Sequence, residues 1–500
     1  MDLQKKLIYN GISLTLKTPF LSSVTLRLLE NNIKKRIKKG AGATGIPYVE
    51  EIKGQLLANL LKQTMKNIQK GYISYEYIEG AKKTLAGNQF LGDRRKIIRE
   101  EFKKKYGMYP PGFLTISPTQ KCNLRCIGCY AASHSHTVAT LDYEVLKRLL
   151  KEQRDIFGSN FVVVSGGEPF IYRSNGKSIL DIAEEFSDMF FHVYTNGTLL
   201  TEDVVRRMSH LGNITPVISV EGYEKETDER RGKGIYKRIL GSMERLRKYG
   251  VAFGISVTAT KKNIDLLLED KFYEYYFETL GATYMWIFHL MPIGRAKDTM
   301  GLMISPEERV SLYHQWERML FEKRYFIGDF WNSGAASDGC IAYGRSGGYL
   351  YIDWNGNIMP CVFVPYYVDN IYDLYKKGKT IVDSLMSEFF VRGRRWQENY
   401  GYNRKKEPSN WLAPCSIRDH YDNFRKNILT EDARPEDKNA AEALKDPEYY
   451  EKMKEFDEKL HNLTEPIWQQ KYLNGIKKST QFIVKNVSNT INSILKKEVA

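Results

Sequence analysis

The chain has 500 residues, more than one compact domain usually needs, so we expect one large core with smaller appendages. Its residues are 42% hydrophobic and 27% charged, and no apolar run is long enough to span a membrane, which argues against an integral membrane protein. Six cysteines are too few for a secreted disulfide framework, and the net charge of +15 suggests an anionic neighbour of some kind.

The N-terminal region, residues 1–108, has the patterning of helices. Met1 leads into no apolar stretch of the kind a signal peptide needs, so we expect a cytoplasmic protein. Residues 14–39 mix apolar and basic side chains, and residues 472–497 are similar in kind. These two ends suggest peripheral contact with an anionic membrane surface, although helices packed on the core with their charges in water explain them equally well. No nucleic-acid module accompanies the charge, so we expect no nucleic-acid partner.

Beyond this region, short apolar runs alternate with amphipathic segments in a regular way. The runs that read as strands are 113–117, 161–165, 190–195, 214–220, 251–260 and 282–290. A helical segment follows each of them, and the last is 305–320. Such alternation predicts a parallel sheet with helices outside it, either an open doubly wound sheet or a full or partial barrel.

Polar and glycine-rich patches follow the strands one by one. In chain order they are the loop at Cys122, SGGEP (165–169), TNGT (195–198), the pair Ser219 and Glu221, the pair Thr258 and Thr260, and HLMPIGR (289–295). Because the carboxyl ends of parallel strands meet at one edge of a sheet, all six patches are predicted to lie at that edge.

The first patch carries three cysteines within eight positions, Cys122, Cys126 and Cys129. Three thiolates are one short of a closed zinc site, which implies an open coordination position. Cysteine thiolates also hold four-iron clusters, and a cluster with three of them leaves one iron free to bind a small molecule. Three incidental buried thiols are the bland alternative, which the tight spacing disfavours.

CNLRCIGCY (122–130) resembles the CxxxCxxC signature of the radical S-adenosylmethionine (SAM) superfamily, and the resemblance extends over about residues 109 to 300. It implies an α/β fold whose core is a partial (β/α)6 barrel. It also implies that Cys122, Cys126 and Cys129 hold a site-differentiated 4Fe-4S cluster, whose free iron binds the amino and carboxylate groups of SAM. Gly128 and Tyr130 would lie near the adenine.

Further motifs carry the same resemblance. SGGEP resembles the family's GGE motif, whose carboxylate would receive the ammonium of SAM, and RRGKGIYKRIL (230–240) resembles its RGxGxF stretch. Arg231 is therefore the candidate partner for the carboxylate of SAM, with Arg230 as the alternative. MPIGRA (291–296) resembles the PxGRA segment of several members, although a proline-glycine turn would look the same. The expected SAM-binding residues are Tyr130, Gly166, Gly167, Glu168, Asn196, Ser219, Glu221, Arg231 and Thr258.

The other three cysteines, Cys340, Cys361 and Cys415, are far apart in sequence. GGYLYIDWNGNIMPC (347–361) predicts two strands around an Asn355-Gly356 turn. With WLAPCSIRDH (411–420) it resembles the SPASM or twitch extension of radical SAM enzymes, which implies a second, auxiliary iron-sulfur cluster. The fourth iron would be open or would bind Asp419 or His420, and dispersed structural thiols remain the alternative. HSH (134–136) is expected to be a polar loop.

Together these features predict four regions: a basic, helical N-terminal region at 1–108, a radical SAM core barrel at 109–325, a small auxiliary-cluster domain at 326–425, and a helical tail at 426–500. The implied activity is reductive cleavage of SAM to a 5′-deoxyadenosyl radical, which abstracts hydrogen from a C–H bond of a peptide, lipid or other organic substrate. An electron donor such as flavodoxin or ferredoxin would be the partner. The alternative is a non-catalytic iron-sulfur protein of electron transfer or cluster assembly.

Overall fold

The computed structural model describes residues 45–90, 92–402 and 408–474. The basic segment 14–39 and nearly all of the segment 472–497 lie outside the described residues. Within the described part of the chain, no helix is both long and apolar enough to cross a bilayer.

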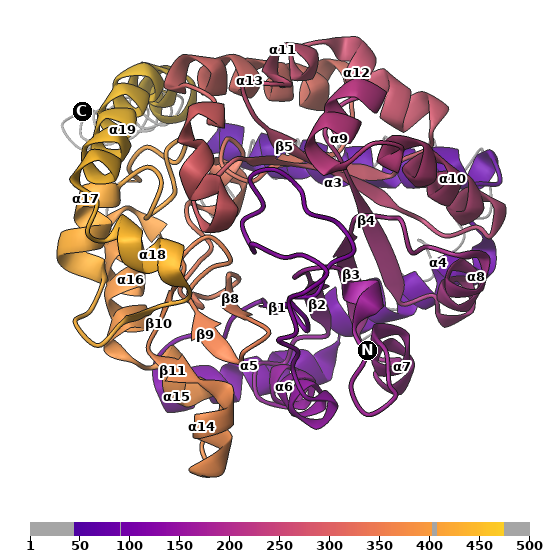
Figure 1. The fold of residues 1–500 in the computed structure, drawn as a ribbon, viewed down its shortest axis with the longest axis horizontal. Helices are drawn as coiled ribbons and strands as arrows, with labels where there is room; N and C mark the ends of the chain where they lie inside the picture. Colours follow the sequence, from indigo (N-terminus) through magenta and orange to yellow (C-terminus); the bar gives the residue numbers. More distant parts are fainter. Residues whose placement is uncertain (1–44, 91, 403–407, 475–500) are drawn as a thin grey trace, which may run out of the picture.

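The core is one parallel sheet built from all six expected strands. They are β1 (Phe113–Ile116), β2 (Phe161–Val164), β3 (Phe190–Thr195), β4 (Ile214–Val220), β5 (Gly254–Ala259) and β6 (Tyr284–His289). They pair in chain order, all parallel, with a register such as Ile116 beside Val164. Figure 1 shows the strands curving around a centre with the helices outside, so the expected partial barrel is confirmed.

Helices cover the outer face of this sheet. Those between and after the strands are α6 (Tyr143–Asp155), α7 (Ile179–Glu185), α8 (Glu202–Leu211), α9 (Glu224–Arg231), α10 (Ile235–Lys248), α11 (Ile264–Leu267), α12 (Asp270–Glu274) and α13 (Pro306–Arg318). Side-chain caps start several of them: Thr201 accepts from the backbone N–H of Val204 at α8, and Ser305 forms a capping box at α13. The expected helix over 264–280 is divided, because the backbone at Glu269 is extended.

Among the residues that the structure describes, three α-helices precede the barrel and six follow it. The first group is α3 (Pro47–Gln69), α4 (Tyr75–Ala81) and α5 (Asp93–Tyr106), and the second is α14 (Ile371–Lys376), α15 (Ile381–Leu385), α16 (Glu388–Asn399), α17 (Tyr421–Asn423), α18 (Lys438–Ala443) and α19 (Pro447–Ile467). Figure 1 shows α3 running behind the strands and α19 beside α13. Both groups therefore pack on the outside of the barrel.

Strand alternation sends every second side chain into the barrel. At its amino end the inward side chains form a lattice of rings, in which Phe161 stacks on Phe190 and His192 stacks on Tyr284. His192 is buried among these rings, and burial lowers its pKa to about 3, so it is a neutral packing residue at physiological pH. This end of the barrel is a filled core, and the site must lie at the other end.

The sheet continues past both ends of the six strands. β7 (Ile327–Asp329) adds to β6, while β8 (Tyr349–Ile352) adds to β1 at the opposite end of the strand order. β9 (Asn357–Met359) and β11 (Asp369–Asn370) extend the sheet beyond β8 as antiparallel strands, and β10 (Tyr366–Tyr367) pairs with β12 (Arg434–Pro435) separately. The expected hairpin around Asn355-Gly356 is thus present. The expected boundary at residue 325 does not divide the sheet, since β7 and β8 both belong to it.

Residues 330–348 join β7 to β8 and therefore connect one end of the barrel sheet to the other. We call this segment the seam. A buried ion pair ties the barrel to the region beyond it: Arg309 on α13 donates to both carboxylate oxygens of Asp419, at 2.5 and 3.1 Å, and to the carbonyl of Leu412. Neither side chain of the pair is exposed.

Replacing Arg309 with methionine should destabilise the fold by about 3–5 kcal/mol, because Asp419 would remain as a buried charge without its partner. Thermal unfolding followed by circular dichroism measures this. Arg318→Met is the matched control, since Arg318 pairs with Asp270 at the surface and its loss should cost about 1 kcal/mol or less. Equal losses in the two variants would contradict the structural role given to the buried pair.

Candidate functional site

The cysteine loop, residues 119–134, leaves the carboxyl end of β1 and lies inside the ring of strands in Figure 1. Backbone hydrogen bonds hold it on two sides. The N–H of Cys122 donates to the carbonyl of His134 at 3.2 Å. The N–H of Ile127 donates to the carbonyl of Arg230 at 3.0 Å, and the side chain of Arg230 donates through Nε to the carbonyl of Ile127 at 3.1 Å. The three cysteines on this loop are therefore positioned by their neighbours before any metal binds.

Gly166 and Gly167 approach the cysteine loop rather than open space. The N–H of Gly167 donates to Thr119 at 2.9 Å, and a Cβ on Gly167 would lie 2.3 Å from the backbone oxygen of Lys121. Gly166 has φ +117°, and a Cβ there would lie 2.7 Å from the backbone oxygen of Thr119. Both positions therefore require glycine because the backbone of the cysteine loop lies too close for a side chain. The resemblance of SGGEP to a ligand-binding motif had suggested a close approach to the ligand instead.

Glu168 follows these glycines and is fully buried. Its two carboxylate oxygens accept hydrogen bonds from Thr195 Oγ1, at 2.8 and 3.0 Å, and from the N–H groups of Asn196 and Phe170, at 2.8 and 3.1 Å. Burial raises the pKa of Glu168 to about 7, against the opposing effect of these donors. No cation among the described residues bonds to this carboxylate. An added ammonium group would supply the missing charge.

Asn196 connects Glu168 to the cysteine loop. Its Nδ2 donates to Asn123 Oδ1 at 2.9 Å and to the sulfur of Cys122 at 3.8 Å. The backbone N–H of Leu124 also donates to this sulfur, at 3.4 Å. Burial raises the pKa of Cys122 to about 12 when no metal is bound, so iron must displace a proton there.

Two arginines and a glutamate form a charged group beside the other two cysteines. Glu221 lies 2.6 Å from Arg230 and 2.5 Å from Arg231, and its second carboxylate oxygen is buried without a hydrogen-bond partner. Burial raises the pKa of Cys126, and the nearby guanidinium of Arg231 opposes this rise. Arg230 and Arg231 thus share one carboxylate, and both remain candidates to bind an anion.

Ser219 and Thr258 face into the barrel at the carboxyl ends of neighbouring strands. The alternation that brings Thr215 to the hydroxyl of Tyr284 inside the barrel also turns Ser219 inward on β4, and Thr258 lies on the matching face of β5. Both side chains are half-buried, so they line accessible space rather than core. Tyr130, whose pKa burial raises to about 12, packs its ring against Phe363 in the same region.

The MPIGRA segment holds the cysteine loop from the opposite side. A Cβ on Gly294 would lie 2.0 Å from the backbone oxygen of Tyr130, and Arg295 donates to the backbone oxygens of Cys126 and Ser133 at 3.3 and 2.8 Å. Gly294 begins a 3-10 helix (Gly294–Leu302), and the start of this helix fits against the loop that carries the cysteines.

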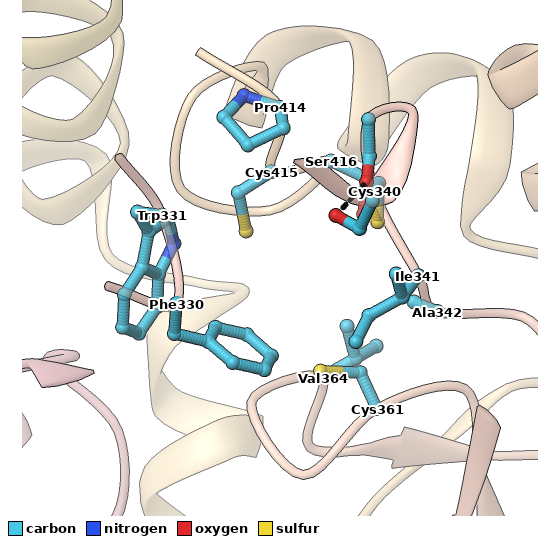
Figure 2. Close-up of a pocket in the computed structure, with 12 residues that line it drawn as sticks. Phe330, Trp331, Cys340, Ile341, Ala342, Cys361, Val364, Pro414, Cys415 and Ser416 are labelled. Atoms are coloured by element: carbon cyan, nitrogen blue, oxygen red, sulfur yellow. Dashed lines mark hydrogen bonds between the residues drawn. The ribbon is translucent and has the colours of Figure 1, made fainter. Parts of the chain in front are cut away.

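The remaining cysteines line one pocket at the seam. Cys340, Cys361 and Cys415 come from three segments, and Figure 2 shows their sulfur atoms facing a common space. The pocket encloses about 440 Å³ of space not filled by atoms, counting the solvent at its opening. Aromatic and aliphatic side chains, including Phe330, Trp331 and Val364, complete the lining. Three cysteines far apart in sequence thus share one site.

Of the three sulfur atoms, that of Cys361 has the most hydrogen-bond partners among the described residues. It shares a hydrogen bond of 2.9 Å with the hydroxyl of Tyr349 and accepts another from the N–H of Phe363 at 3.4 Å. Burial raises the pKa of Cys361 to about 12, and it also raises the pKa of Cys415. Neither proposed fourth ligand is free: Asp419 pairs with Arg309, and His420 bonds through Nε2 to the carbonyl of Ala413 at 3.0 Å.

Two residues near these sites have no motif that could have revealed them. Glu436, at the end of β12, is surrounded by protein but keeps part of its surface exposed, and Tyr130, Tyr351 and Asp353 are its electrostatic neighbours. Burial and Asp353 raise its pKa well above the usual range. Trp331 lines the second cysteine pocket. Tertiary contacts bring both residues in from segments with no recognisable signature.

HSH is a local turn, in which the N–H of His136 donates to His134.

A barrel of parallel strands with cysteine, glycine and carboxylate loops at its carboxyl edge defines a class of α/β-barrel enzyme. Residues 116–268 match the sequence profile of the radical SAM superfamily. This part of the chain is a radical SAM domain, and proteins of that superfamily bind a 4Fe-4S cluster and SAM.

The curated relatives of this chain have names that describe different activities. The chain is 28% identical to the AdoMet-dependent heme synthase of Methanosarcina barkeri over 290 residues, 52% of this chain and 79% of that protein. It is 26% identical to the sporulation killing factor maturation protein SkfB of Bacillus subtilis over 262 residues, 51% of this chain and 60% of SkfB. The match thus covers less than two thirds of SkfB. The structure of Streptococcus suis SuiB bound to its precursor peptide SuiA is 18% identical in sequence, with a TM-score of 0.47, and the match covers 59% of this chain and 69% of SuiB. This similarity is low.

The cysteine sets fit clusters better than single ions. In residues 45–90, 92–402 and 408–474 no three His, Cys, Asp or Glu are gathered closely enough to hold one metal ion. Each thiolate of a four-iron cluster binds a different iron, so its ligands surround a larger volume. Both sets consist only of thiols, and backbone N–H groups already donate to the sulfur atoms of Cys122 and Cys361, where they would stabilise cluster thiolates.

Gly167→Ala should displace the cysteine loop, because its Cβ would overlap two backbone oxygens. We expect a loss of roughly 1–3 kcal/mol of stability and reduced iron content after anaerobic reconstitution. Gly301→Ala is the control, since a Cβ there meets no atom within 4 Å. Iron content equal to the control would show that the loop tolerates the methyl group and that the close contact is not required.

Proposed function

We propose that this protein is a radical SAM enzyme that abstracts hydrogen from a C–H bond of an organic substrate held between two iron-sulfur clusters. The observation that carries the proposal is the relation between the two cysteine sets. Tyr130, next to Cys129, contacts Phe363 at 6.0 Å between ring centroids, and Phe363 contacts Trp331 of the second pocket at 5.0 Å. Both sets therefore border the same aromatic-lined mouth of the barrel.

The first site would hold the cluster through Cys122, Cys126 and Cys129 and would bind SAM around it. When bound, the reduced cluster and SAM supply a 5′-deoxyadenosyl radical. Glu168 is suited to the ammonium group of SAM because it is a buried carboxylate that lacks a cation. Arg231, or Arg230, would bind the carboxylate of SAM through its guanidinium N–H groups, and Glu221 would hold both guanidinium groups in position. Ser219, Thr258 and Tyr130 would line the remaining SAM space.

The second site would hold one auxiliary cluster through Cys340, Cys361 and Cys415. Its fourth iron would be open to substrate or solvent, because Asp419 and His420 are occupied by other partners. The donors on Cys361 support a thiolate there. A soluble electron donor such as flavodoxin or ferredoxin would supply the electron for each turnover.

The substrate would lie in the mouth, against Phe288, Phe330 and Phe363. Glu436 is the ionisable residue that we assign to this space, where its carboxyl has no hydrogen-bond partner among the described residues. Aromatic walls favour a substrate with apolar surface. Relatives named for heme synthesis, Fe-coproporphyrin III synthesis and maturation of a sporulation killing factor make Fe-coproporphyrin III and peptides the first compounds to try, with membrane lipid as a third.

The reaction class is tested first. We expect the wild-type protein, reconstituted with iron and sulfide without oxygen and reduced with dithionite, to form 5′-deoxyadenosine from SAM. The variant Cys122→Ala/Cys126→Ala/Cys129→Ala should form none but should keep some iron on the later cysteines. Chromatography of the nucleoside and iron analysis provide the two readouts.

A wild-type protein with an intact first cluster and no 5′-deoxyadenosine would favour the alternative, an iron-sulfur protein of electron transfer or cluster assembly. If the triple variant kept no iron, the auxiliary cluster alone would be withdrawn. The two parts of the proposal are thus tested separately.

SAM binding should weaken as the pH falls. Glu168 has a pKa near 7, and only its ionised form pairs with an ammonium group, so affinity should fall up to about tenfold per pH unit below 7. Isothermal calorimetry of the oxidised, reconstituted protein between pH 8 and pH 5.5 gives the profile. Glu168→Gln should bind SAM more weakly and with a flat profile over this range.

Because other ionisable groups could cause a similar dependence of SAM affinity on pH, the Glu168→Gln variant tests whether Glu168 is the titrating group. If the glutamine variant kept the slope of the wild type, the titrating group would lie elsewhere and the ammonium contact would be wrongly assigned. Iron content measured beside each titration ensures that loss of the cluster does not cause the loss of affinity.

A further inference from the structure

Trp331 forms part of the wall of the second cysteine pocket, the one lined by Cys340, Cys361 and Cys415. It follows β7, where the N–H groups of Trp331 and Asn332 both donate to Asp329 Oδ1, at 3.0 and 2.9 Å. This turn directs the indole ring into the pocket, and only 1% of the residue is exposed. His289 stacks on the ring at 5.1 Å and Phe363 packs against it at 5.0 Å, so the ring cannot rotate freely.

The indole N–H of Trp331 is buried and has no hydrogen-bond partner in the described part of the chain. In Figure 2 the nitrogen lies on the edge of the ring that faces the sulfur of Cys415. The hydroxyl groups in the lining are already occupied: Ser416 bonds to Tyr343 at 2.8 Å, and Ser337 donates to the backbone of Gly334 at 3.0 Å. A buried donor without an acceptor is costly, and native proteins rarely keep one.

We infer that the indole N–H of Trp331 donates a hydrogen bond to a sulfur atom of the iron-sulfur cluster held by Cys340, Cys361 and Cys415, and thereby raises the reduction potential of that cluster. The inference rests on the proposed function, because it requires the auxiliary cluster. A sulfide or thiolate in this pocket would be the acceptor that the indole lacks. Reduction adds negative charge to the cluster, and a donor that stabilises this charge favours the reduced state.

One cation behind the ring acts in the same direction. The guanidinium of Arg418 lies 5.1 Å over the ring of Trp331, fully buried, and its Nε and Nη2 also lack partners in the described residues. Burial and Arg309 lower the pKa of Arg418 only to about 10, so it is charged at neutral pH. Asp329 and Asp419 are the opposing charges, while the low pKa of His289, about 4, leaves it neutral.

The test uses the full chain with Cys122, Cys126 and Cys129 changed to alanine, so that the auxiliary cluster is the only one present. Trp331→Phe is introduced into this parent, which removes the N–H but keeps an aromatic ring. Trp468→Phe is the matched control, since Trp468 is also buried with an unpartnered N–H but does not line the pocket. Redox titration followed by electron paramagnetic resonance gives the midpoint potential of each protein.

The expected result is a more negative midpoint for Trp331→Phe than for the parent and for Trp468→Phe, at equal iron content. An unchanged midpoint would overturn the inference and leave the auxiliary cluster in place. A parent without iron would overturn both the inference and the auxiliary site of the proposed function.

A second measurement covers the case in which Trp331→Phe does not fold. The parent is labelled with indole-15N tryptophan, and the reduced cluster is examined by pulsed electron paramagnetic resonance. We expect a 15N coupling, because Trp331 is the tryptophan among the residues that line the pocket. No coupling in a parent that contains the cluster would rule out the hydrogen bond without any substitution at Trp331.

Discussion

The close contact between the backbone of the cysteine loop and three glycines is the constraint on which the site depends. Gly166 and Gly167 meet the loop on the β2 side, and Gly294 meets it on the β6 side, each at a distance that leaves no room for a Cβ. The loop is held from two strands of the barrel at once. Three thiols at short sequence spacing can surround a cluster only if the chain between them follows one path, and these contacts define that path.

Burial raises the pKa of both kinds of ionisable group at the site, the cysteine thiols and the carboxyl of Glu168. Without a metal it raises the pKa of Cys122 and Cys361, which keeps the thiols protonated and makes iron binding a proton-releasing step. It also raises the pKa of Glu168, which prepares a carboxylate to gain more from a cation than an exposed one would. In both places the protein provides a desolvated site that an incoming charge completes.

The seam explains why the second site lies beside the first. Residues 330–348 join β7 to β8 across the two ends of the barrel sheet, and several residues of this segment line the second pocket. Phe363 contacts rings from both sites, Tyr130 on one side and Trp331 on the other. The buried pair of Arg309 and Asp419 holds the Cys415 segment against the barrel. The connection between the two ends of the sheet and the Cys415 segment together place the second pocket beside the barrel.

The sequence by itself determined the parallel sheet, its six core strands, the Asn355-Gly356 hairpin and the edge at which the first cysteine loop lies, because these follow from local periodicity and short motifs. Periodicity left an open sheet and a barrel as alternatives, and only the resemblance to the radical SAM superfamily implied the partial barrel. It also pointed to the glycines of SGGEP, but not to their contact with Thr119 and Lys121. Only the tertiary structure joined Cys340, Cys361 and Cys415 in one pocket, removed Asp419 and His420 as free ligands, and brought in Glu436 and Trp331. Those features depend on contacts between segments distant in sequence, where neither spacing nor residue type specifies which side chains meet.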